Sequence, residues 1–201
     1  EKVLIATLLA NEHNVGFSKM SISSSIDENV LKRTNEFYFS HDNLIEIQKS
    51  LVNYHHSLEI TKNWGLGKSS SSDGMRLPVT SKTIYTDYNM HYNNRGGSIY
   101  RHISDQYSPY YVQMLEGRDS SHVLDGLLYH DTNLEIFDHS TDTAGYTEQI
   151  FALTYLLGFN FRPRIRNVEQ QQLYAFETFE TENMKLKKIN EKIVIENYPE
   201  I

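Results

Sequence analysis

The sequence predicts an α/β fold, in which a mixed β-sheet carries helices on its faces and an N-terminal helical lobe lies beside it. Three observations predict this fold. Apolar residues recur with helical spacing over the first sixty residues. Short runs of β-forming residues follow, and nearer the C-terminus they alternate with two apolar helices. The apolar share of 39%, with 14 Tyr and 9 Phe, is sufficient to bury a core.

Length, charge and cysteine content narrow the class of protein. A chain of 201 residues suits one compact domain with a lobe attached. It contains no cysteine, which excludes disulfides and thiolate metal sites and agrees with a cytoplasmic protein. The longest apolar run, from Val3 to Ala10, is far shorter than the roughly 20 residues of a membrane helix, so no membrane partner is expected. The net charge of −7 argues against a basic coat for nucleic acid but leaves room for a local basic groove.

Residues 1–62 predict a helical lobe. The stretch EKVLIATLLANEHN carries an apolar stripe that Gly16 can close, and residues 27–39 repeat the spacing. A third helix is expected from about His41 to His56, with Ser40 as its N-cap. We expect an antiparallel helical lobe, with Trp64, the only tryptophan, packing it onto the sheet. Because the chain starts at Glu1 without a methionine, we expect a piece of a longer protein.

From Trp64 onward the pattern changes to strands. The expected strands are 76–84, 98–103 and 110–115, with a turn at 93–97. The expected later elements are a helix opened by Ser120-Ser121, a strand at 134–139, a helix at 145–157 closed by Gly158 and an edge strand at 159–165 containing Pro163.

A single acid, Asp73, lies in the stretch WGLGKSSSSDGMRLP between a run of four serines and Gly74. Small residues there would let another backbone approach closely, with one carboxylate projecting. By itself the stretch favours a polar turn, because Asp-Gly is a turn signal, and a flexible serine linker is the other alternative. A second acid in a similar setting, Asp142, comes just before a long apolar helix and favours a paired role.

The order of elements makes a mixed sheet with helices on its faces, and the ribonuclease H-like plan is one known solution. In that plan the first and fourth strands are neighbours, so Asp73 and Asp142 are expected to converge although 142 − 73 = 69 positions separate them. Two carboxylates brought together repel each other unless a cation lies between them. Oxygen ligands suit Mg²⁺ or Mn²⁺.

The motifs SSSSDGMR, SDQYSPY, HVLDGLLYH, HSTDTAGYTEQIFALTYLLGF and PRIR, in this order, resemble the catalytic region of Tn3-family bacterial transposases. NYHHSLEITKNWGLGKSSSSDG also matches, so the resemblance covers about residues 1–201. It implies a DDE-type nuclease and strand transferase on a ribonuclease H-like fold. Such an enzyme cleaves DNA at each transposon end and uses the exposed 3′ hydroxyl to attack target DNA.

The resemblance also implies roles for the two acids. Asp73 and Asp142 are similar to the first and second acids of the triad, with two Mg²⁺ or Mn²⁺ ions, Asp73 bridging both. The third acid, a glutamate, has no match in this chain, so the stretch by itself is expected to be inactive. The implied divisions are a lobe at 1–62, a catalytic core at 63–175, and the start of an inserted segment at 176–201 that we expect to be poorly ordered.

The implied partners are transposon-end and target DNA in the bacterial cytoplasm, with self-association on DNA in the complete protein. The candidates for phosphate contacts are Lys68, Arg76, Arg162, Arg164 and Arg166. Solvated surface charge is the alternative interpretation of these cations.

Two other functions stay open at the level of sequence. One is a DNA-binding or scaffolding module without catalysis. The other is an unrelated magnesium phosphoesterase that uses Asp73, Asp142 and a local acid such as Asp138. The histidines fit no zinc spacing, although His102 could approach the acids. Three further acids are expected to act as turn, cap or hydrogen-bonded residues: Asp105, Asp119 and Asp125.

Overall fold

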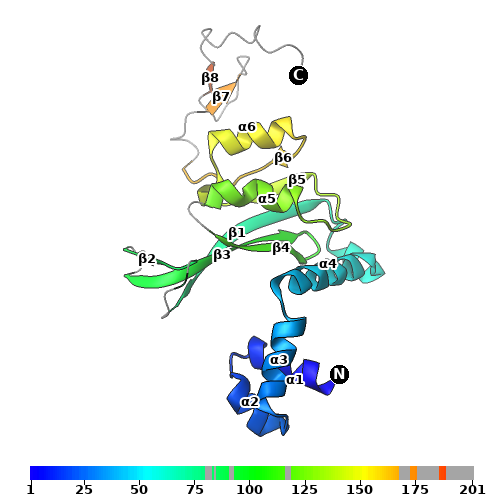
Figure 1. Cartoon of the computed structure of the whole chain (residues 1–201). Coiled ribbons are helices and arrows are strands. Elements are labelled where there is room, and N and C mark those ends of the chain that lie inside the picture. The colour runs from blue at the N-terminus through cyan, green and yellow to red at the C-terminus, as the bar shows by residue number, and fades with distance from the viewer. Residues whose placement is uncertain are drawn as a thin grey trace.

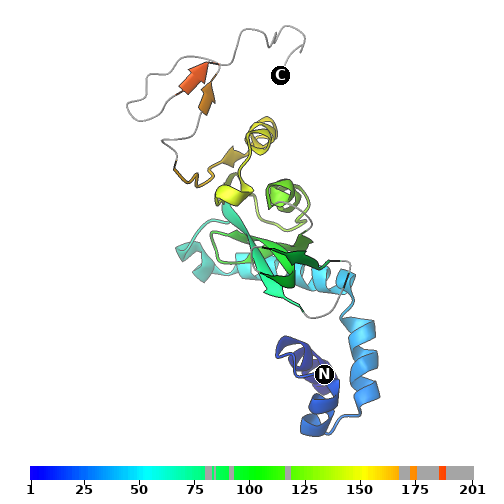
Figure 2. The same ribbon diagram turned by 90° about the vertical axis from the view of Figure 1, so that its left-hand side faces the viewer.

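The computed structural model describes residues 1–79, 83, 85–90, 93–115 and 119–167, and the backbone of 173–175 and 186–188. The described chain is a mixed sheet flanked by helices, as the sequence predicted (Figure 1). Helices α5 (Val123–Leu128) and α6 (Glu148–Leu156) lie over one side of the sheet, and the two views of Figures 1 and 2 agree on this. None of the described helices is both long and apolar enough to cross a bilayer.

The sheet has five principal strands in the order β4-β3-β1-β5-β6, and a short strand β2 pairs with the start of β3. Their bounds are β1 Ser69–Pro78, β2 Asp87–Asn89, β3 Asn94–Ser104, β4 Pro109–Leu115, β5 Asp138–Thr141 and β6 Asn160–Phe161. Strand β3 runs antiparallel to both of its neighbours, β1 and β4. Strands β5 and β6 continue the sheet parallel to β1. A separate parallel pair joins β7 (Leu173–Ala175) to β8 (Leu186–Lys188).

Three helices form a lobe at the end of the molecule that lies away from the sheet (Figure 1). They are α1 (Lys2–Glu12), α2 (Phe17–Ser24) and α3 (Glu28–Tyr38). Leu31 is fully buried between them, and Asp27 caps α3 by accepting a hydrogen bond from the amide of Asn29. The sequence did not predict α2. Gly16, expected to close the first helix, instead precedes α2 with a φ of 79°.

Helix α4 (His41–Ser57) begins at Ser40, as predicted, and packs against the sheet rather than against the lobe. Gln48 donates a 2.8 Å hydrogen bond to the carbonyl of Pro109 at the start of β4. The rings of His55 and His56 bond Ser108 and Gln106 in the turn before it. A short 3-10 helix, η1 (Glu59–Asn63), then leads to β1. Trp64 is 54% exposed, so the expectation that it packs the lobe onto the sheet is wrong.

Strand β1 begins seven residues before the predicted strand at 76–84, so the serine run is neither a turn nor a linker. The physical reason is alternation. Ser70 and Ser72 turn inward, where their hydroxyls find buried partners, whereas Ser71 and Asp73 turn outward. A short polar side chain that is fully hydrogen-bonded can occupy a buried strand position at little cost.

The prediction of a turn at 93–97 is wrong for the two glycines in this range. Asn93 has a positive φ of 50°, but β3 already begins at Asn94. Gly96 and Gly97 lie inside β3, because neighbouring segments of the same chain pass close to them. A Cβ on Gly96 would lie 2.6 Å from the carbonyl oxygen of Leu77. These glycines therefore mark a close approach within the sheet.

The C-terminal half keeps its predicted order with shifted bounds. The strand expected at 134–139 is β5, four residues later, and the edge strand expected at 159–165 is reduced to the two residues of β6. Leu134 and Ile136 are buried core residues that precede the strand. Although Pro163 interrupts the ladder, Arg162 and Arg164 still donate backbone hydrogen bonds to the carbonyls of His139 and Thr141. The edge position of this segment is thus confirmed.

The core of the sheet unit lies between the strands and the helices α5 and α6. Its buried members are Val52, Tyr100, Tyr110, Val123, Leu127, Leu134, Ile136, Ile150 and Phe161. Gly126 allows α5 to sit directly on β3, because a Cβ there would lie 2.3 Å from Nδ1 of His102. The glycine that weakened the helix prediction is therefore what lets α5 dock on the sheet.

Candidate functional site

Asp73 lies in the outer half of the central strand β1, with its side chain exposed on the face turned away from Ser72. Its backbone is fixed on one side by β3, where its register partner is Arg101. Arg101 is also exposed, so a cation from the neighbouring strand lies beside the acid. Sequence reasoning did not single out Arg101, because nothing in the sequence indicates which residue of β3 pairs with Asp73.

Asp142 follows β5 directly and is also exposed. One of its carboxylate oxygens, Oδ1, accepts hydrogen bonds from the backbone amides of Ala144 at 2.9 Å and Gly145 at 3.2 Å. These bonds cap the short 3-10 helix η3 (Thr143–Gly145). The carboxylate is therefore held in one orientation, and these two amides leave its second oxygen unused.

The sheet brings the two acids to adjacent positions. Strands β1 and β5 pair in parallel through Ser69–Ser72 and Asp138–Thr141, and Ser72 is the partner of Thr141. The next residue on each chain is Asp73 and Asp142. Because paired strands lie about 4.8 Å apart, the backbones of the two acids leave the β1–β5 pair from neighbouring positions.

A third acid, Asp119, lies beside β1 at Gly74, close enough for the charges of Asp142 and Asp73 to act on it. It begins the 3-10 helix η2 (Asp119–His122), and a Cβ added to Gly74 would lie 2.8 Å from its Oδ2. Burial, together with the charges of Asp142 and Asp73, raises the pKa of Asp119. The sequence interpretation of Asp119 as a turn or cap residue missed this proximity. The signal was Gly74 itself, since a glycine inside a strand marks a close approach.

Behind the acids lies a buried polar cluster, which we call the serine–histidine cluster: Ser70, Ser72, Tyr100 and His139. The ring of His139 bonds Ser70 Oγ through Nδ1 at 2.7 Å and Ser72 Oγ through Nε2 at 2.9 Å. Ser72 Oγ also bonds the hydroxyl of Tyr100 at 2.8 Å. Tyr100 and His139 are completely buried. Burial raises the pKa of Tyr100, so its hydroxyl stays protonated.

The two buried imidazoles of this region are uncharged at neutral pH. Burial lowers the pKa of His102 to about 4 and that of His139 to about 3. Nε2 of His102 bonds the carbonyl of Val123, so this nitrogen carries the proton. His102 thus points to α5 and not to the acids, and the expectation that it could approach them is wrong.

The other acids considered from the sequence serve structural ends. Asp105 accepts hydrogen bonds from the amides of Gly67 and Ser69 and so caps the start of β1, as expected. Asp125 accepts from Gln113, which confirms a hydrogen-bonded acid. Asp138 lies four residues before Asp142 on β5, about 13 Å away along an extended strand. It bonds Asn160 and pairs with Arg162 instead.

The predicted phosphate-contacting cations lie in three settings. Arg76 pairs with Asp87 at 2.8 Å and is only 16% exposed. Lys68 lies over the ring of Phe137. The exposed Arg162, Arg164 and Arg166 follow the outer edge of β5, which we call the arginine edge.

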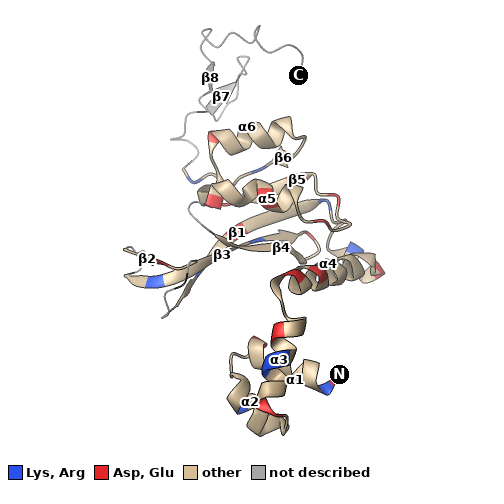
Figure 3. Cartoon of the chain, viewed as in Figure 1, with Lys and Arg blue, Asp and Glu red and all other residues tan. Residues whose placement is uncertain are grey.

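The arginine edge reaches the immediate vicinity of Asp142. The hydroxyl of Thr143 donates to the carbonyl of Arg164 and accepts from the amide of Arg166, each at 2.9 Å. The last two arginines therefore flank the residue that follows Asp142. Elsewhere acidic and basic residues are interspersed along the described chain (Figure 3).

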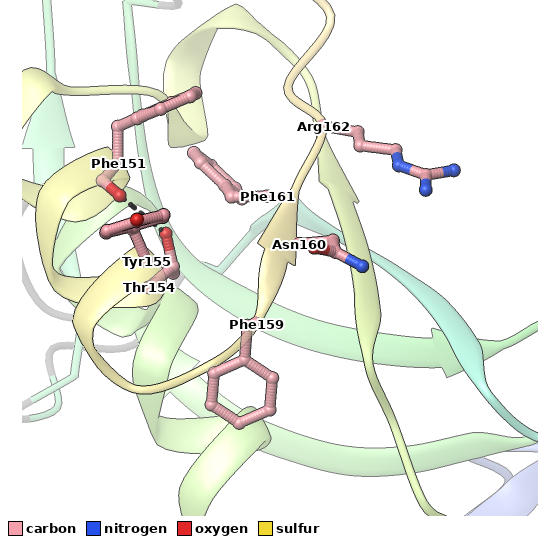
Figure 4. Close-up of a pocket in the computed structure, with 7 residues that line it drawn as sticks. All are labelled: Phe151, Thr154, Tyr155, Phe159, Asn160, Phe161 and Arg162. Carbon is pink, nitrogen blue, oxygen red and sulfur yellow. Dashed lines mark hydrogen bonds between the residues drawn. The ribbon is translucent and has the colours of Figure 1, made fainter.

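A cavity of about 310 Å³ lies between α6 and β6. Figure 4 shows its aromatic lining, with Arg162 extending away from the rings. The lining is Phe151, Thr154, Tyr155, Phe159, Asn160, Phe161 and Arg162. It contains no acid, so the cavity is distinct from the Asp73–Asp142 pair. Within the described part of the chain, no group of three or more His, Cys, Asp or Glu side chains is arranged to hold a metal ion.

Comparison with known proteins places these features in a family. A family model described as "Tn3 transposase DDE domain" matches residues 1–201. The chain is 41% identical over 208 aligned positions to the "Transposase for transposon Tn1546" of Enterococcus faecium, covering 99% of this chain and 21% of that protein.

Two further relatives agree. The "Transposase for transposon Tn2501" of Escherichia coli is 42% identical over 177 positions, which cover 86% of this chain and 18% of that protein. The "Transposase for transposon gamma-delta" of Escherichia coli (strain K12) is 35% identical over 168 positions, 81% of this chain and 17% of that protein. The chain thus spans about a fifth of the length of these curated relatives.

Proposed function

The chain belongs to the Tn3 transposase DDE domain family, and from this premise we propose that it forms the part of a longer DNA transposase that carries two of the three catalytic acids. The activity proposed for the complete protein is divalent-metal-dependent cleavage of DNA at transposon ends, followed by strand transfer into target DNA. The observation that carries the proposal is the β1–β5 pairing, whose last pair, Ser72 and Thr141, is followed directly on each strand by Asp73 and Asp142.

We further propose that the sheet is a ribonuclease H-like one. The strand order β4-β3-β1-β5-β6, with only β3 antiparallel to the central strand, supports that plan. In a sheet of this kind the first and fourth of the five principal strands are neighbours, and here these are β1 and β5. Residues at equivalent heights on them can then serve one site although far apart in sequence.

The donor set agrees with the metal that such a family uses. Asp73 and Asp142 offer carboxylate oxygens, which Mg²⁺ and Mn²⁺ prefer, and Mg²⁺ is commonly bound by only one or two carboxylates together with water and phosphate. When bound, two such ions would activate the attacking hydroxyl and stabilise the leaving oxygen of the phosphodiester. We propose Asp73 and Asp142 as the residues that hold them.

The chain itself contributes orientation. The amides of Ala144 and Gly145 hold Oδ1 of Asp142 and leave Oδ2 directed by the same geometry. The backbone of Asp73 is fixed by β3 on one side, and the residue before it, Ser72, is paired with β5 on the other. A carboxylate with a fixed backbone and a fixed rotamer loses little entropy when it becomes a ligand.

We propose that Lys68, which precedes β1 on the other side of β5, is one phosphate contact, and that Arg164 and Arg166 contact the DNA backbone next to Asp142, with Arg162 further along the arginine edge. Their exposure and their position on the arginine edge support this role. Phosphate contacts of this kind position DNA without reading its sequence. Arg76, which is held by Asp87, remains a prediction from the sequence alone. DNA ends, target DNA and self-association on DNA are proposed for the complete protein.

The test is Asp142→Ala in the full-length protein. We expect cleavage of transposon-end DNA to fall at least about 1,000-fold, the size of effect seen when a central catalytic group is removed. Binding of the ends should change less than about threefold, since Asp142 is not a DNA-binding cation. Asp138→Ala, four residues earlier on the same strand, is the matched control and should retain cleavage. Normal cleavage by Asp142→Ala would remove this residue from the mechanism.

A further inference from the structure

We propose that the serine–histidine cluster is the device that fixes the register of β1 against β5 and so the separation of Asp73 and Asp142, with His139 as a positioning residue. The inference rests on the proposed function, because it concerns the geometry of the same acid pair. His139 does not touch either acid. It acts through Ser72, which precedes Asp73, and through its own strand, which leads to Asp142.

One imidazole joins the two strands at two points. His139 comes from β5, and both of its partners, Ser70 and Ser72, come from β1. Adjacent strands are normally joined by backbone hydrogen bonds, which are satisfied equally well after a slip of two residues. A ring with one donor and one acceptor, bonded to two hydroxyls two residues apart, is satisfied in one register only.

The sequence of β1 gives this bond an unusual importance. Ser69 to Ser72 are four identical residues, so only their hydrogen bonds to His139 let their side chains distinguish one register from another. A slip of two residues would move Asp73 by about 6.7 Å along the strand direction relative to Asp142. Ligand oxygens of a shared Mg²⁺ must each lie about 2.0–2.1 Å from the ion. Such a slip would therefore separate the acids beyond what a shared ion tolerates.

The ring of His139 itself packs between rings from two other strands of the sheet. It stacks on His102 from β3, with ring centroids 5.3 Å apart and planes at 27°, and on Phe161 from β6, at 6.3 Å and 12°. Serines on the intervening strand β1 are small enough to let the rings of β3 and β5 meet above them. The run of serines thus has a structural purpose, which is to make room for this stack.

Because the serine–histidine cluster is buried, its polar atoms depend on one another for their hydrogen bonds. His139 and Tyr100 have no exposed surface, so water cannot replace a lost partner. Burial keeps the imidazole neutral at neutral pH, with one N–H and one acceptor nitrogen available for the two hydroxyls. Removing one partner leaves a buried polar group without a hydrogen bond, whereas replacing all of them by apolar groups of the same shape can be nearly neutral for stability.

The difference between removing one partner and replacing all of them allows the positioning of the two acids to be tested separately from the stability of the fold. In the full-length protein, His139→Phe keeps the stacked ring but loses both hydrogen bonds. The variant S70A/S72A/Y100F/H139F makes the whole cluster apolar and leaves none of its members unpaired. The control is Phe161→Leu, which loosens packing on the same ring and keeps both bonds. The measurements are the unfolding temperature, the Mn²⁺ dissociation constant by electron paramagnetic resonance, and kcat and KM for end cleavage.

We expect Phe161→Leu to lower the unfolding temperature while its Mn²⁺ dissociation constant and kcat stay within twofold of wild type. The all-apolar variant should recover most of the unfolding temperature lost in His139→Phe. It should nevertheless bind Mn²⁺ at least tenfold more weakly and show kcat lowered at least 100-fold with KM for DNA unchanged. Ser70→Ala, which is three residues from Asp73 and removes one of the two bonds, should weaken Mn²⁺ binding severalfold.

Wild-type Mn²⁺ affinity and kcat in a stably folded all-apolar variant would overturn the inference. If that variant does not fold, wild-type values in Ser70→Ala overturn it equally. The failure of the proposed function gives a different result, namely full cleavage by Asp142→Ala. A protein that is inactive as Asp142→Ala but unaffected by the loss of the cluster would keep its function and refute the positioning role alone.

Discussion

The three acids near the end of β5 are held in different ways, and the difference determines what each can do. Asp142 is oriented by two backbone amides, and Asp73 is exposed on a rigid strand. Asp119 is half-buried, and burial and the charges of the other two raise its pKa. An acid whose ionised form is disfavoured in the folded state opposes folding at neutral pH. Such strain at an acid cluster is typical of functional sites.

Because folding raises the pKa of Asp119, we predict that Asp119→Asn stabilises the metal-free protein. The unfolded carboxyl titrates near 3.8 and the folded one higher, so the penalty of ionisation exists above both values and disappears as the pH falls below 3.8. The unfolding temperature of Asp119→Asn should therefore exceed that of wild type at pH 7, and the gain should shrink toward pH 4. Thermal unfolding in chelator-treated buffer measures it.

The same substitution at Asp105 provides the control. Asp105 accepts two backbone hydrogen bonds at the start of β1. Its replacement by Asn keeps one acceptor oxygen and loses the other, so the protein should be destabilised by about 1 kcal/mol, the net value of one hydrogen bond. Destabilisation by Asp119→Asn at pH 7 would contradict the assignment of its raised pKa to burial and to the charges of the other two acids.

The two buried imidazoles predict a loss of stability in mild acid. Folding lowers the pKa of His102 to about 4 and of His139 to about 3, against 6.5 in the unfolded chain. Their contribution is complete above pH 6.5 and is lost progressively as the pH falls toward 4 and 3. Each histidine should lower the free energy of unfolding by up to about 1.4 kcal/mol per pH unit in that window.

Urea unfolding between pH 7.5 and 4.5 measures this slope. The variant His139→Phe should show a smaller slope than wild type, because one of the two titrating groups is gone. Phe161→Leu, which loosens packing on the same ring and removes no titratable group, supplies the control and should leave the slope unchanged. An equal slope in wild type and His139→Phe would show that His139 does not titrate on unfolding.

At the scale of elements, the site is built where strands end rather than where they are longest. Strand β5 has four residues and β6 two, yet the chain after β6 keeps bonding along β5 through Arg162 and Arg164. This extension carries the arginine edge past Asp142. An edge that is rich in arginine also resists pairing with another sheet, which is the structural interpretation of the same residues.

The arginine edge is predicted to bind phosphate. In the full-length protein, Arg164→Ala and Arg166→Ala should each weaken DNA binding several-fold. Each should also reduce the slope of log affinity against log salt by about 1, irrespective of DNA sequence. Arg33→Ala, an exposed arginine of α3, is the control and should leave both quantities unchanged. Fluorescence anisotropy over a range of salt concentrations measures both. An unchanged salt slope would leave these arginines as edge protection only.

At the scale of the whole molecule, the helical lobe and the sheet unit are distinct in their packing. Helices α1, α2 and α3 surround Leu31, whereas α4 bonds the turn before β4. Among the described residues, the extensive contacts of helices α1, α2 and α3 are with one another. The sequence-based division at residue 62 remains a prediction, and the packing of α4 favours a division nearer Ser40.

We therefore predict that deleting residues 1–38 leaves the sheet unit folded. Its unfolding temperature should remain within about 3 °C of the intact chain, because less than about 1 kcal/mol of contact is lost. Deleting residues 1–58 also removes α4 and should prevent cooperative unfolding. Calorimetry of the two truncated chains distinguishes these outcomes. A large destabilisation by the shorter deletion would show that the lobe supports the sheet.

The sequence by itself determined what depends on neighbours along the chain. The helix cap at Ser40, the stop at Gly158 and the alternation of strands and helices are local, because each rests on a few adjacent residues. The two acids were also singled out from their sequence context. The segment 176–201 was expected to be poorly ordered. Only the backbone of 186–188 belongs to the described residues, so the expectation for this segment stays a prediction.

Only the tertiary structure decided what depends on partners far away in the sequence. Whether Ser69–Ser72 was turn, linker or strand depended on His139, about seventy residues later, because a buried serine is acceptable only when its hydroxyl is bonded. Asp119 joined the acids for the same reason, since Gly74 leaves the space that it occupies. Hydrogen bonds and packing between strands are formed across space, and the order of residues along the chain does not record which of them meet.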